Sequence, residues 1–435
     1  MPLGSTALPF IVIGGGVAGL VVARDLAIAG ERVVLVEATD RLGGQVRRHR
    51  LAGLDLDAGA EAYAARNPSV PELARELGLA GELVSPNPAG SWLFTAESDA
   101  YPLPATSLLG IPAVIDEQLE RVLGAQATAR VAADAELPAE LGADAVTLGE
   151  LVRVRMGEAV VDRLVAPVTT GVHSAHPDAL PLDRVAPGLL AALAREGSLA
   201  AAVRTLRDQA PAGSAVGGIR GGMARLVDEL ERELARLSVD VRVGAPAEDV
   251  TPTSIRVGAE RLLGTVVVAA PGVLAPASIR PATVVTLIVE RPELAAAPRG
   301  SGVLVAPGAP VTARALTHQS AKWDWLAHAA AGLDVLRLSY EHPVPTDTAR
   351  GDATTLLGVT IRPRDIVESA VVEWQRSAIE ASAAHPQVGE AASGTGLASV
   401  VQHARATARR LLAVGGTRED DVRLKREKGS TTNDD

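Results

Sequence analysis

The sequence predicts an α/β protein, α+β overall, that opens with a Rossmann-like nucleotide-binding unit. Pro9 to Ile13 is a short apolar run typical of a buried parallel strand. Val17 to Ala29 has the pattern of a helix that ends at Gly30, and Arg32 to Val36 is a second, valine-rich strand. Between the first strand and the helix, Gly14 to Gly19 fits the G-x-G-x-x-G pattern of dinucleotide-binding turns. We therefore expect a βαβ unit at the start of the chain.

The rest of the chain combines helical and strand patterns. Thr147, followed by Glu150 and an apolar run, is typical of a capping box at the start of a helix. The charged and polar residues from Gly415 to Asp435 predict a disordered tail. Helices are expected over 113–165, Leu189 to Leu206, Met223 to Leu237 and Ser399 to Leu412, and strands over Leu262 to Ala270, 283–290, 302–306 and 334–340.

The length and the order of these elements predict several interleaved domains. A chain of 435 residues is longer than one hydrophobic core usually supports. A cofactor domain built from separated segments explains the order better than domains arranged one after another. The expected segments are 1–84, 207–275 and 372–414 for the cofactor domain, 85–112 and 276–371 for an inserted mixed-sheet substrate domain, 113–206 for a helical subdomain and 415–435 for the tail.

Composition excludes several classes of function. The chain has no cysteine, so it forms no disulfide, thiolate metal site or thiol nucleophile. Its net charge of −10 and its small number of aromatic residues (four Trp, three Tyr and two Phe) argue against nucleic-acid binding. No segment reads as transmembrane, and the N-terminal apolar run lacks a basic region before it. We expect a cytoplasmic protein.

The glycine-rich turn has a specific physical use. Gly14 permits the tight turn, Gly16 lets the backbone approach a pyrophosphate, and Gly19 lets the helix pack closely. The helix N-terminus supplies N–H groups and a positive dipole end for phosphates. Glu37, at the end of the second strand, is expected to accept hydrogen bonds from ribose hydroxyls. The alternative for the glycines is a purely structural turn, and the alternative for Glu37 is a charge at a strand end without a ligand.

The string that follows resembles a particular group of flavoproteins. Residues 37–44 read E-x-x-x-R-x-G-G, with Arg41 and the pair Gly43 and Gly44. This string is similar to that of the superfamily that includes the flavin-containing amine oxidases. The resemblance implies FAD as the cofactor and an FAD-binding domain of the glutathione-reductase and amine-oxidase type.

Further stretches resemble those of one family within that superfamily. They are Asp57 to Tyr63 with Arg66 to Pro68, Leu103 to Pro112, Pro167 to Pro177, Gly221 to Leu226, Thr317 to Trp323, Arg337 to Tyr340, Trp374, and Gly389 to Leu397. They occur in the family's order along nearly the whole chain. The family that they resemble is that of the bacterial oxygen-dependent coproporphyrinogen III and protoporphyrinogen IX oxidases. The arginine-rich, cysteine-free composition favours the coproporphyrinogen version.

The resemblance also implies site residues. The implied FAD contacts are Gly14, Gly15, Gly16, Val17, Ala18, Gly19, Glu37, Ala38, Arg41, Gly43, Gly44, Gln45, Gly59, Ala60, Glu61, Ala62, Ala247, Trp374, Thr395, Gly396 and Leu397. The implied substrate-side residues are Arg66, Asn67, His173 and Lys322. For Arg66 a surface arginine is the alternative, and for Lys322 a buried ion pair. His173 and His176 are interpreted as loop or cavity-lining residues rather than metal ligands.

The implied reaction removes six electrons from a porphyrinogen in three two-electron steps, with molecular oxygen reduced to hydrogen peroxide. We expect non-covalent FAD, no metal, no nucleic acid and at most peripheral membrane contact. No residue stands out as a catalytic base. Three alternatives stay open: a protoporphyrinogen IX oxidase, a flavin amine oxidase of the same superfamily, and a non-catalytic flavin-binding homologue. Because propionates are anionic and the chain is acidic, arginines must reverse the local field at the site.

Overall fold

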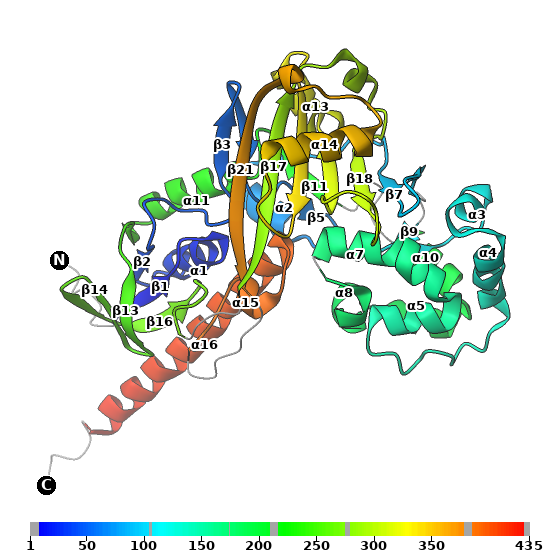
Figure 1. Cartoon of the computed structure of the whole chain (residues 1–435). Coiled ribbons are helices and arrows are strands. Elements are labelled where there is room, and N and C mark those ends of the chain that lie inside the picture. The colour runs from blue at the N-terminus through cyan, green and yellow to red at the C-terminus, as the bar shows by residue number, and fades with distance from the viewer. Residues whose placement is uncertain are drawn as a thin grey trace, which may run out of the picture.

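A four-stranded parallel sheet holds the N-terminal βαβ unit, as predicted (Figure 1). The computed structural model describes residues 8–103, 107–173, 175–208, 216–274, 279–377 and 385–429, without the side chains of 171–173, 279–280, 376–377 and 414–429. The βαβ unit consists of β1 (Phe10–Ile13), α1 (Val17–Ile28) and β2 (Val33–Val36). With β12 (Asp240–Arg242) and β16 (Thr265–Val268), the strand order is β12-β2-β1-β16.

Three helices cover this sheet through one hydrophobic core. They are α1, α11 (Ala224–Arg236) and α16 (Leu397–Gly429). Leu20 of α1, Leu230 of α11 and Val401 of α16 are fully buried in the same cluster. The carboxylate of Asp57 accepts hydrogen bonds from the backbone N–H groups of Met223 and Ala224, at 3.0 and 3.2 Å, and so fixes the start of α11. Segments far apart in sequence therefore build one domain.

The strand expected over Leu262 to Ala270 is two strands in the structure. β13 (Ala247–Thr251), β14 (Ser254–Val257) and β15 (Glu260–Leu263) form an antiparallel sheet of their own, and β16 then joins the parallel sheet. The break falls at Gly264, where a Cβ atom would lie 2.2 Å from the carbonyl oxygen of Pro9. Pairing with β1, which lies far away in sequence, decides where the strand divides.

A seven-stranded mixed sheet forms the second layer, as predicted for the inserted region. Its order is β21-β17-β20-β19-β18-β7-β8, and β18 and β7 are the parallel pair. The strands are β7 (Trp92–Phe94), β8 (Ala100–Pro102), β17 (Ile279–Val289), β18 (Gly302–Val305), β19 (Ala315–His318), β20 (Asp334–Tyr340) and β21 (Ile366–Ser377). β21 pairs with β17 without interruption across position 372, so the expected domain boundary falls inside a strand. Helix α14 (Thr346–Leu357) packs on this sheet (Figure 1).

Shorter elements lie outside these two sheets. β3 (Arg48–Leu51) and β4 (Leu54–Asp57) form a hairpin, and β5 (Tyr63–Ala64), β11 (Val216–Ile219) and β6 (Leu83–Val84) form a three-stranded sheet. The others are α2 (Ser69–Glu76), β9 (Ser107–Leu108), β10 (Ile111–Pro112), α12 (Gln319–Lys322), α13 (Asp324–Ala330) and α15 (Glu390–Ser393).

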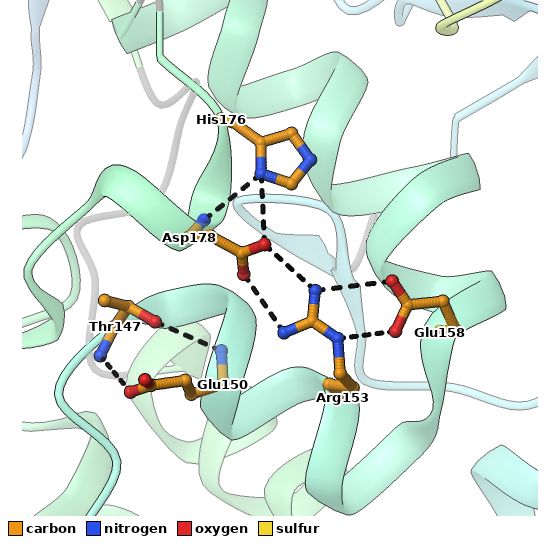
Figure 2. Close-up of polar contacts among 6 residues, drawn as sticks. All are labelled: Thr147, Glu150, Arg153, Glu158, His176 and Asp178. Carbon is orange, nitrogen blue, oxygen red and sulfur yellow. Dashed lines mark hydrogen bonds and ion pairs between the residues drawn. The ribbon is translucent and has the colours of Figure 1, made fainter.

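A helical region follows β10 and lies at the right in Figure 1. Its helices are α3 (Glu117–Leu123), α4 (Ala125–Ala132), α5 (Leu148–Met156), α6 (Glu158–Val160), a π-helical turn (Val161–Val165), α7 (Ala166–His173), α8 (Leu182–Val185), α9 (Leu189–Glu196) and α10 (Leu199–Asp208). The expected capping box is confirmed: Glu150 N–H donates to Thr147 Oγ1 at 3.2 Å and Thr147 N–H to the Glu150 carboxylate at 3.0 Å (Figure 2). The single helix expected over Leu189 to Leu206 is divided at Gly197, which has a φ of 81°.

The C-terminal helix is longer than expected. α16 packs against α1 and α2 and continues through Gly415 to Gly429, whereas the sequence predicts disorder from 415 onward. Residues 430–435 lie outside the described part of the chain. Within that part, no helix has both the length and the apolar character that crossing a bilayer requires.

Candidate functional site

One large cavity lies where the parallel sheet, the seven-stranded sheet and the helical region meet. Its volume is about 2180 Å³, more than twice the upper end of the roughly 300–1,000 Å³ of usual small-molecule sites. The cavity can therefore hold two ligands at once. Its lining includes Gly14, Glu37 and Ala269 from the carboxyl ends of the parallel strands, Thr317, Arg337 and Trp374 from the seven-stranded sheet, and Val168, Val185 and Leu206 from the helical region. The carboxyl ends of parallel strands are where such sheets bind ligands.

The glycine-rich turn lies at the end of β1 and opens onto this cavity. Gly14 has a φ of +108°, and a Cβ atom there would lie 2.8 Å from the backbone nitrogen of Ala270. At Gly19 a Cβ atom would lie 1.9 Å from the carbonyl oxygen of Gly14, so the turn itself, more than the strand, excludes a side chain. At Gly16, the residue before α1, a Cβ atom would meet nothing within 4 Å. This open position and the helix N-terminus fit a bound phosphate group.

Glu37 links the glycine turn to the loop that follows β2. One carboxylate oxygen, Oε2, accepts the N–H of Gly15 at 2.7 Å. The other, Oε1, accepts both the N–H and the hydroxyl of Thr39 at 2.8 Å. Glu37 also lines the cavity, whereas the neighbouring Ala38 is exposed and does not. A carboxylate has further lone pairs, so Glu37 retains the capacity to accept a ribose hydroxyl.

The second glycine pair packs against the first turn. The N–H of Gly43 donates to the carbonyl oxygen of Gly15 at 2.8 Å, and a Cβ atom on Gly44 would lie 3.3 Å from the Cα atom of Gly16. Arg41 lines the cavity with a largely exposed side chain. Gln45, also in the lining, donates to the carboxylate of Glu390 at 3.2 Å. These residues form a continuous wall beside the glycine turn.

The segment Gly59 to Ala62 forms another wall with Trp374. A Cβ atom on Gly59 would lie 1.8 Å from the carbonyl oxygen of Gln45, so only glycine fits there. The indole N–H of Trp374 donates to the carbonyl oxygen of Ala58 at 3.1 Å, and the guanidinium of Arg47 lies 4.6 Å from the centre of the indole ring. Trp374 therefore stands beside the Gly59 segment although β21 belongs to the other sheet.

The start of α16 completes the pocket. Thr395, Gly396 and Leu397 line the cavity, together with Gly389 and Glu390. Ala247 does not. It begins β13, pairs with Val257 and packs beside the cluster formed by Val36 and Val266. The structure thus brings predicted cofactor residues together from five segments of the chain: 14–18, 37–45, 59–62, Trp374 and 395–397. It leaves Gly15, Gly19, Ala38 and Ala247 out of the cavity lining.

The predicted substrate residues differ in their surroundings. Arg66 is an exposed residue of the cavity lining, and within the described part of the chain no carboxylate lies within ion-pair distance of it. Partial burial and the nearby Arg207 lower the pKa of Arg66. Asn67 is engaged, because its Oδ1 accepts the N–H of Ser69 at 3.0 Å and its amide donates to Gln402 at 2.8 Å. The side chain of His173 lies outside the described residues.

Lys322 forms an ion pair with Glu61, which is the alternative to a free substrate contact at this position. Its Nζ lies 2.6 Å from Oε1 of Glu61. Burial raises the pKa of Glu61, but Lys322 and Arg337 outweigh that effect and hold the pKa at about 2. Lys322 lines the cavity with its charge already paired.

Cations predominate in the lining of the cavity. Nine Arg and Lys side chains and four carboxylates face it within the described residues. The cations are Arg41, Arg47, Arg66, Arg184, Arg207, Lys322, Arg337, Arg405 and Arg409, and the acids are Glu37, Glu61, Glu72 and Glu390. A protein of net charge −10 therefore presents a positive cavity. Sequence reasoning missed eight of these thirteen: Arg47, Glu72, Arg184, Arg207, Arg337, Glu390, Arg405 and Arg409. Of these, Arg337 and Glu390 lie in stretches used for the family resemblance.

His176 lies away from this cavity, in a surface network of the helical region (Figure 2). Its Nδ1 lies 3.4 Å from Asp178, whose carboxylate pairs with Arg153 at 3.0 Å. Arg153 also pairs with Glu158. In the part of the chain that the structure describes, no group of three or more acidic or histidine side chains is arranged to hold a metal ion.

Comparisons with known proteins identify the family. The model of the flavin-containing amine oxidoreductase family matches residues 17–296. The chain belongs to this family. Among curated proteins, coproporphyrinogen III oxidase of Mycobacterium tuberculosis is 32% identical over 447 residues, covering 96% of this chain and 94% of that protein. The coproporphyrinogen III oxidase of Propionibacterium freudenreichii is 27% identical over 412 residues, covering 84% of this chain and 76% of that one.

Solved structures of the family share the fold. A protein of Exiguobacterium assigned as protoporphyrinogen oxidase superposes with a TM-score of 0.79 at 22% identity, covering 94% of this chain and 99% of that one. Cyclohexylamine oxidase from Brevibacterium oxydans superposes with a TM-score of 0.64 at 15% identity, covering 93% and 99%. The protein is thus a flavin-dependent oxidoreductase with the amine-oxidase fold, and its cavity has room for a flavin beside a second ligand.

Proposed function

We propose that this protein is an FAD-dependent oxidase that converts coproporphyrinogen III to coproporphyrin III with molecular oxygen as the acceptor. The observation that carries the proposal is the single cavity that joins a dinucleotide-binding turn to an excess of cations. The names of the relatives that match nearly the whole chain support it. A positive cavity suits a substrate with four propionates better than it suits an amine, which is itself a cation at neutral pH.

The residues of the first part of the cavity would hold the dinucleotide. The N–H groups at the start of α1 would bind the pyrophosphate, and Glu37 would accept the ribose hydroxyls. Gly59 to Ala62, Trp374 and the start of α16 would enclose the ring system. Bound flavin supplies the redox chemistry, which is hydride acceptance and electron transfer to oxygen. The cavity lining contains no histidine or cysteine among the described residues, so the bound FAD would be non-covalent.

The residues of the second part would orient the substrate. Arg66 lies a few residues after the Gly59 segment, in the exposed part of the lining, and has a partner-free guanidinium among the described residues. The apolar side chains of Leu108, Val168 and Leu206 line the same cavity and would contact a macrocycle. Arginine binds carboxylates through paired N–H groups, so Arg66 would fix one propionate while the apolar wall covers the ring.

Anaerobic reduction of the bound flavin tests the proposal. Coproporphyrinogen III added to the purified protein without oxygen should bleach the yellow flavin, and air should restore the colour. Protoporphyrinogen IX should do so more slowly. Bleaching by a primary amine or a polyamine instead would assign the protein to the amine oxidases, and bleaching by none of these would assign a non-catalytic role. Acid precipitation should release FAD into the supernatant, whereas flavin retained in the pellet would contradict non-covalent binding.

A further inference from the structure

A buried cluster of charges forms part of the cavity wall where the two sheets meet. It consists of Glu61, Lys322 and Arg337, all of which line the cavity. Lys322 Nζ lies 2.6 Å from Glu61 Oε1, and the amide of Gln319 donates to Glu61 Oε2 at 2.5 Å. The side chains of Glu61 and Lys322 are each 15% exposed, and that of Arg337 is 9% exposed. Solvent therefore screens these charges weakly.

The guanidinium of Arg337 is only partly satisfied. Its Nη2 donates to the carbonyl oxygen of Gly59. Its Nη1 lies 3.6 Å from Glu61 Oε2, within ion-pair range but beyond hydrogen-bond distance. Nη1 is buried and has no hydrogen-bond acceptor among the described residues. Buried polar groups are nearly always hydrogen-bonded, so an orphaned donor on a cavity wall indicates a ligand that supplies the acceptor.

The charge balance indicates the sign of that ligand. Lys322 and Arg337 carry two positive charges and Glu61 carries one negative charge. Two other titratable groups interact with Arg337, but neither forms an ion pair with it. Burial raises the pKa of Asp57 to about 6, so this carboxylate stays largely ionised at neutral pH, but its two oxygens accept backbone N–H groups at the start of α11. Burial lowers the pKa of His49 and so favours its neutral ring. One carboxylate bound at Arg337 would leave two cations facing two anions, the arrangement that buried charges require.

We propose that Arg337, Lys322 and Glu61 form a carboxylate subsite that holds one propionate of the tetrapyrrole. The subsite is distinct from Arg66, Arg184 and Arg207, because Arg337 is buried whereas Arg66 and Arg184 are exposed. This inference rests on the proposed function. Its consequence is a preference for substrates with four carboxylates, since one macrocycle can then engage the buried and the exposed cations together.

Binding of coproporphyrin III, the stable oxidised tetracarboxylate, tests the subsite. Coproporphyrin III would be titrated with the flavin-loaded protein, and the quenching of the porphyrin fluorescence would be followed. Arg337→Met should weaken binding on the order of ten- to a hundredfold, the value of one charge-assisted contact. The uncharged tetramethyl ester should bind both proteins equally. Arg314→Met is the matched control, because Arg314 precedes β19 in the same sheet but pairs with Glu341 and does not line the cavity.

Two further variants test the sign of the effect. Lys322→Met removes a cation and should weaken binding of coproporphyrin III, whereas Glu61→Gln removes the anion and should tighten it. A merely structural cluster would be damaged by both changes, so weaker binding by Glu61→Gln would overturn the inference. These variants also decide the question if Arg337→Met does not fold.

The remaining outcomes separate this inference from the proposed function. If Arg337→Met binds coproporphyrin III as tightly as the native protein, the subsite is wrong, although bleaching by coproporphyrinogen can still support the proposed function. If Arg337→Met loses flavin or shifts the flavin spectrum without changing porphyrin affinity, the orphaned donor serves the flavin and the inference is overturned. If the native protein is neither bleached nor binds coproporphyrin III, both proposals fail.

Discussion

Replacement of Glu37 by Gln tests the dinucleotide site most directly. The carboxylate accepts Gly15 N–H through one oxygen and Thr39 through the other. A glutamine side chain has a single acceptor oxygen, and its NH₂ group cannot accept either backbone N–H. One backbone donor therefore loses its partner, at a cost of about 1–3 kcal/mol. The variant also loses the negative charge that would accept the ribose hydroxyls. Both effects act on the adenosine side of the pocket.

FAD affinity of Glu37→Gln should fall on the order of ten- to a hundredfold, from a charge-assisted contact of about 1.5–3 kcal/mol. Flavin would be removed from native and variant protein, and FAD titrated back with its fluorescence as the signal. Thr39→Val is the control, since it removes the exposed hydroxyl, which contacts Glu37 and the carbonyl oxygen of Arg41, but retains the carboxylate of Glu37 and the backbone N–H of residue 39. FMN lacks the adenosine, so its affinity should not change. Equal FAD affinity in native protein and Glu37→Gln, or an equal loss for FMN, would refute the reasoning.

Three further predictions concern the substrate side and the stability of the fold. Arg66→Ala should raise KM for coproporphyrinogen about ten- to a hundredfold at low salt with unaltered flavin content, and less in high salt; an unchanged KM at low salt would make Arg66 a surface arginine. Arg155 is fully buried and lies 2.6 Å from Asp134. Arg155→Met should therefore lower the free energy of unfolding, measured by urea denaturation, by about 3–5 kcal/mol; a loss below about 1 kcal/mol would contradict the pairing. Lys322 keeps the folded-state pKa of Glu61 at about 2, below its ordinary 4.5, so this pair's contribution should be complete above pH 4.5 and disappear as the pH falls toward 2. The difference in melting temperature between native protein and Glu61→Gln should therefore narrow on acidification, and a widening difference would reverse the assignment.

The local sequence was sufficient to predict the nucleotide-binding unit. The apolar runs of β1 and β2, the glycines between them and Glu37 all lie within residues 9–44. The capping box at Thr147 is equally local, since it needs residues three positions apart. In each case the partners are neighbours in the chain, so the pattern specifies the geometry without knowledge of the remaining fold.

Other features required the packed structure. The division of the predicted strand at Gly264 depends on the close approach of Pro9. Helix α16 continues through Gly415, where the sequence pattern predicts that ordered structure ends. The sequence alone does not decide whether Lys322 contacts the substrate or forms a buried ion pair. The structure places Glu61 at 2.6 Å from it, although 261 positions separate the two residues.

The positive cavity shows the same division between local and tertiary information. The sequence determined that arginines were needed in an acidic protein, but 42 Arg and Lys residues gave no means of choosing among them. Among the described residues, tertiary packing places nine of them around the cavity, from segments as distant as Arg41 and Arg409, and it buries Arg337 with one N–H donor unpaired. Local patterns fix turns, caps and strand–helix units because their partners are a few residues apart. Charge and ligand specificity depend on which distant side chains share one desolvated cavity, and only the packing of the two sheets and the helical region determines that.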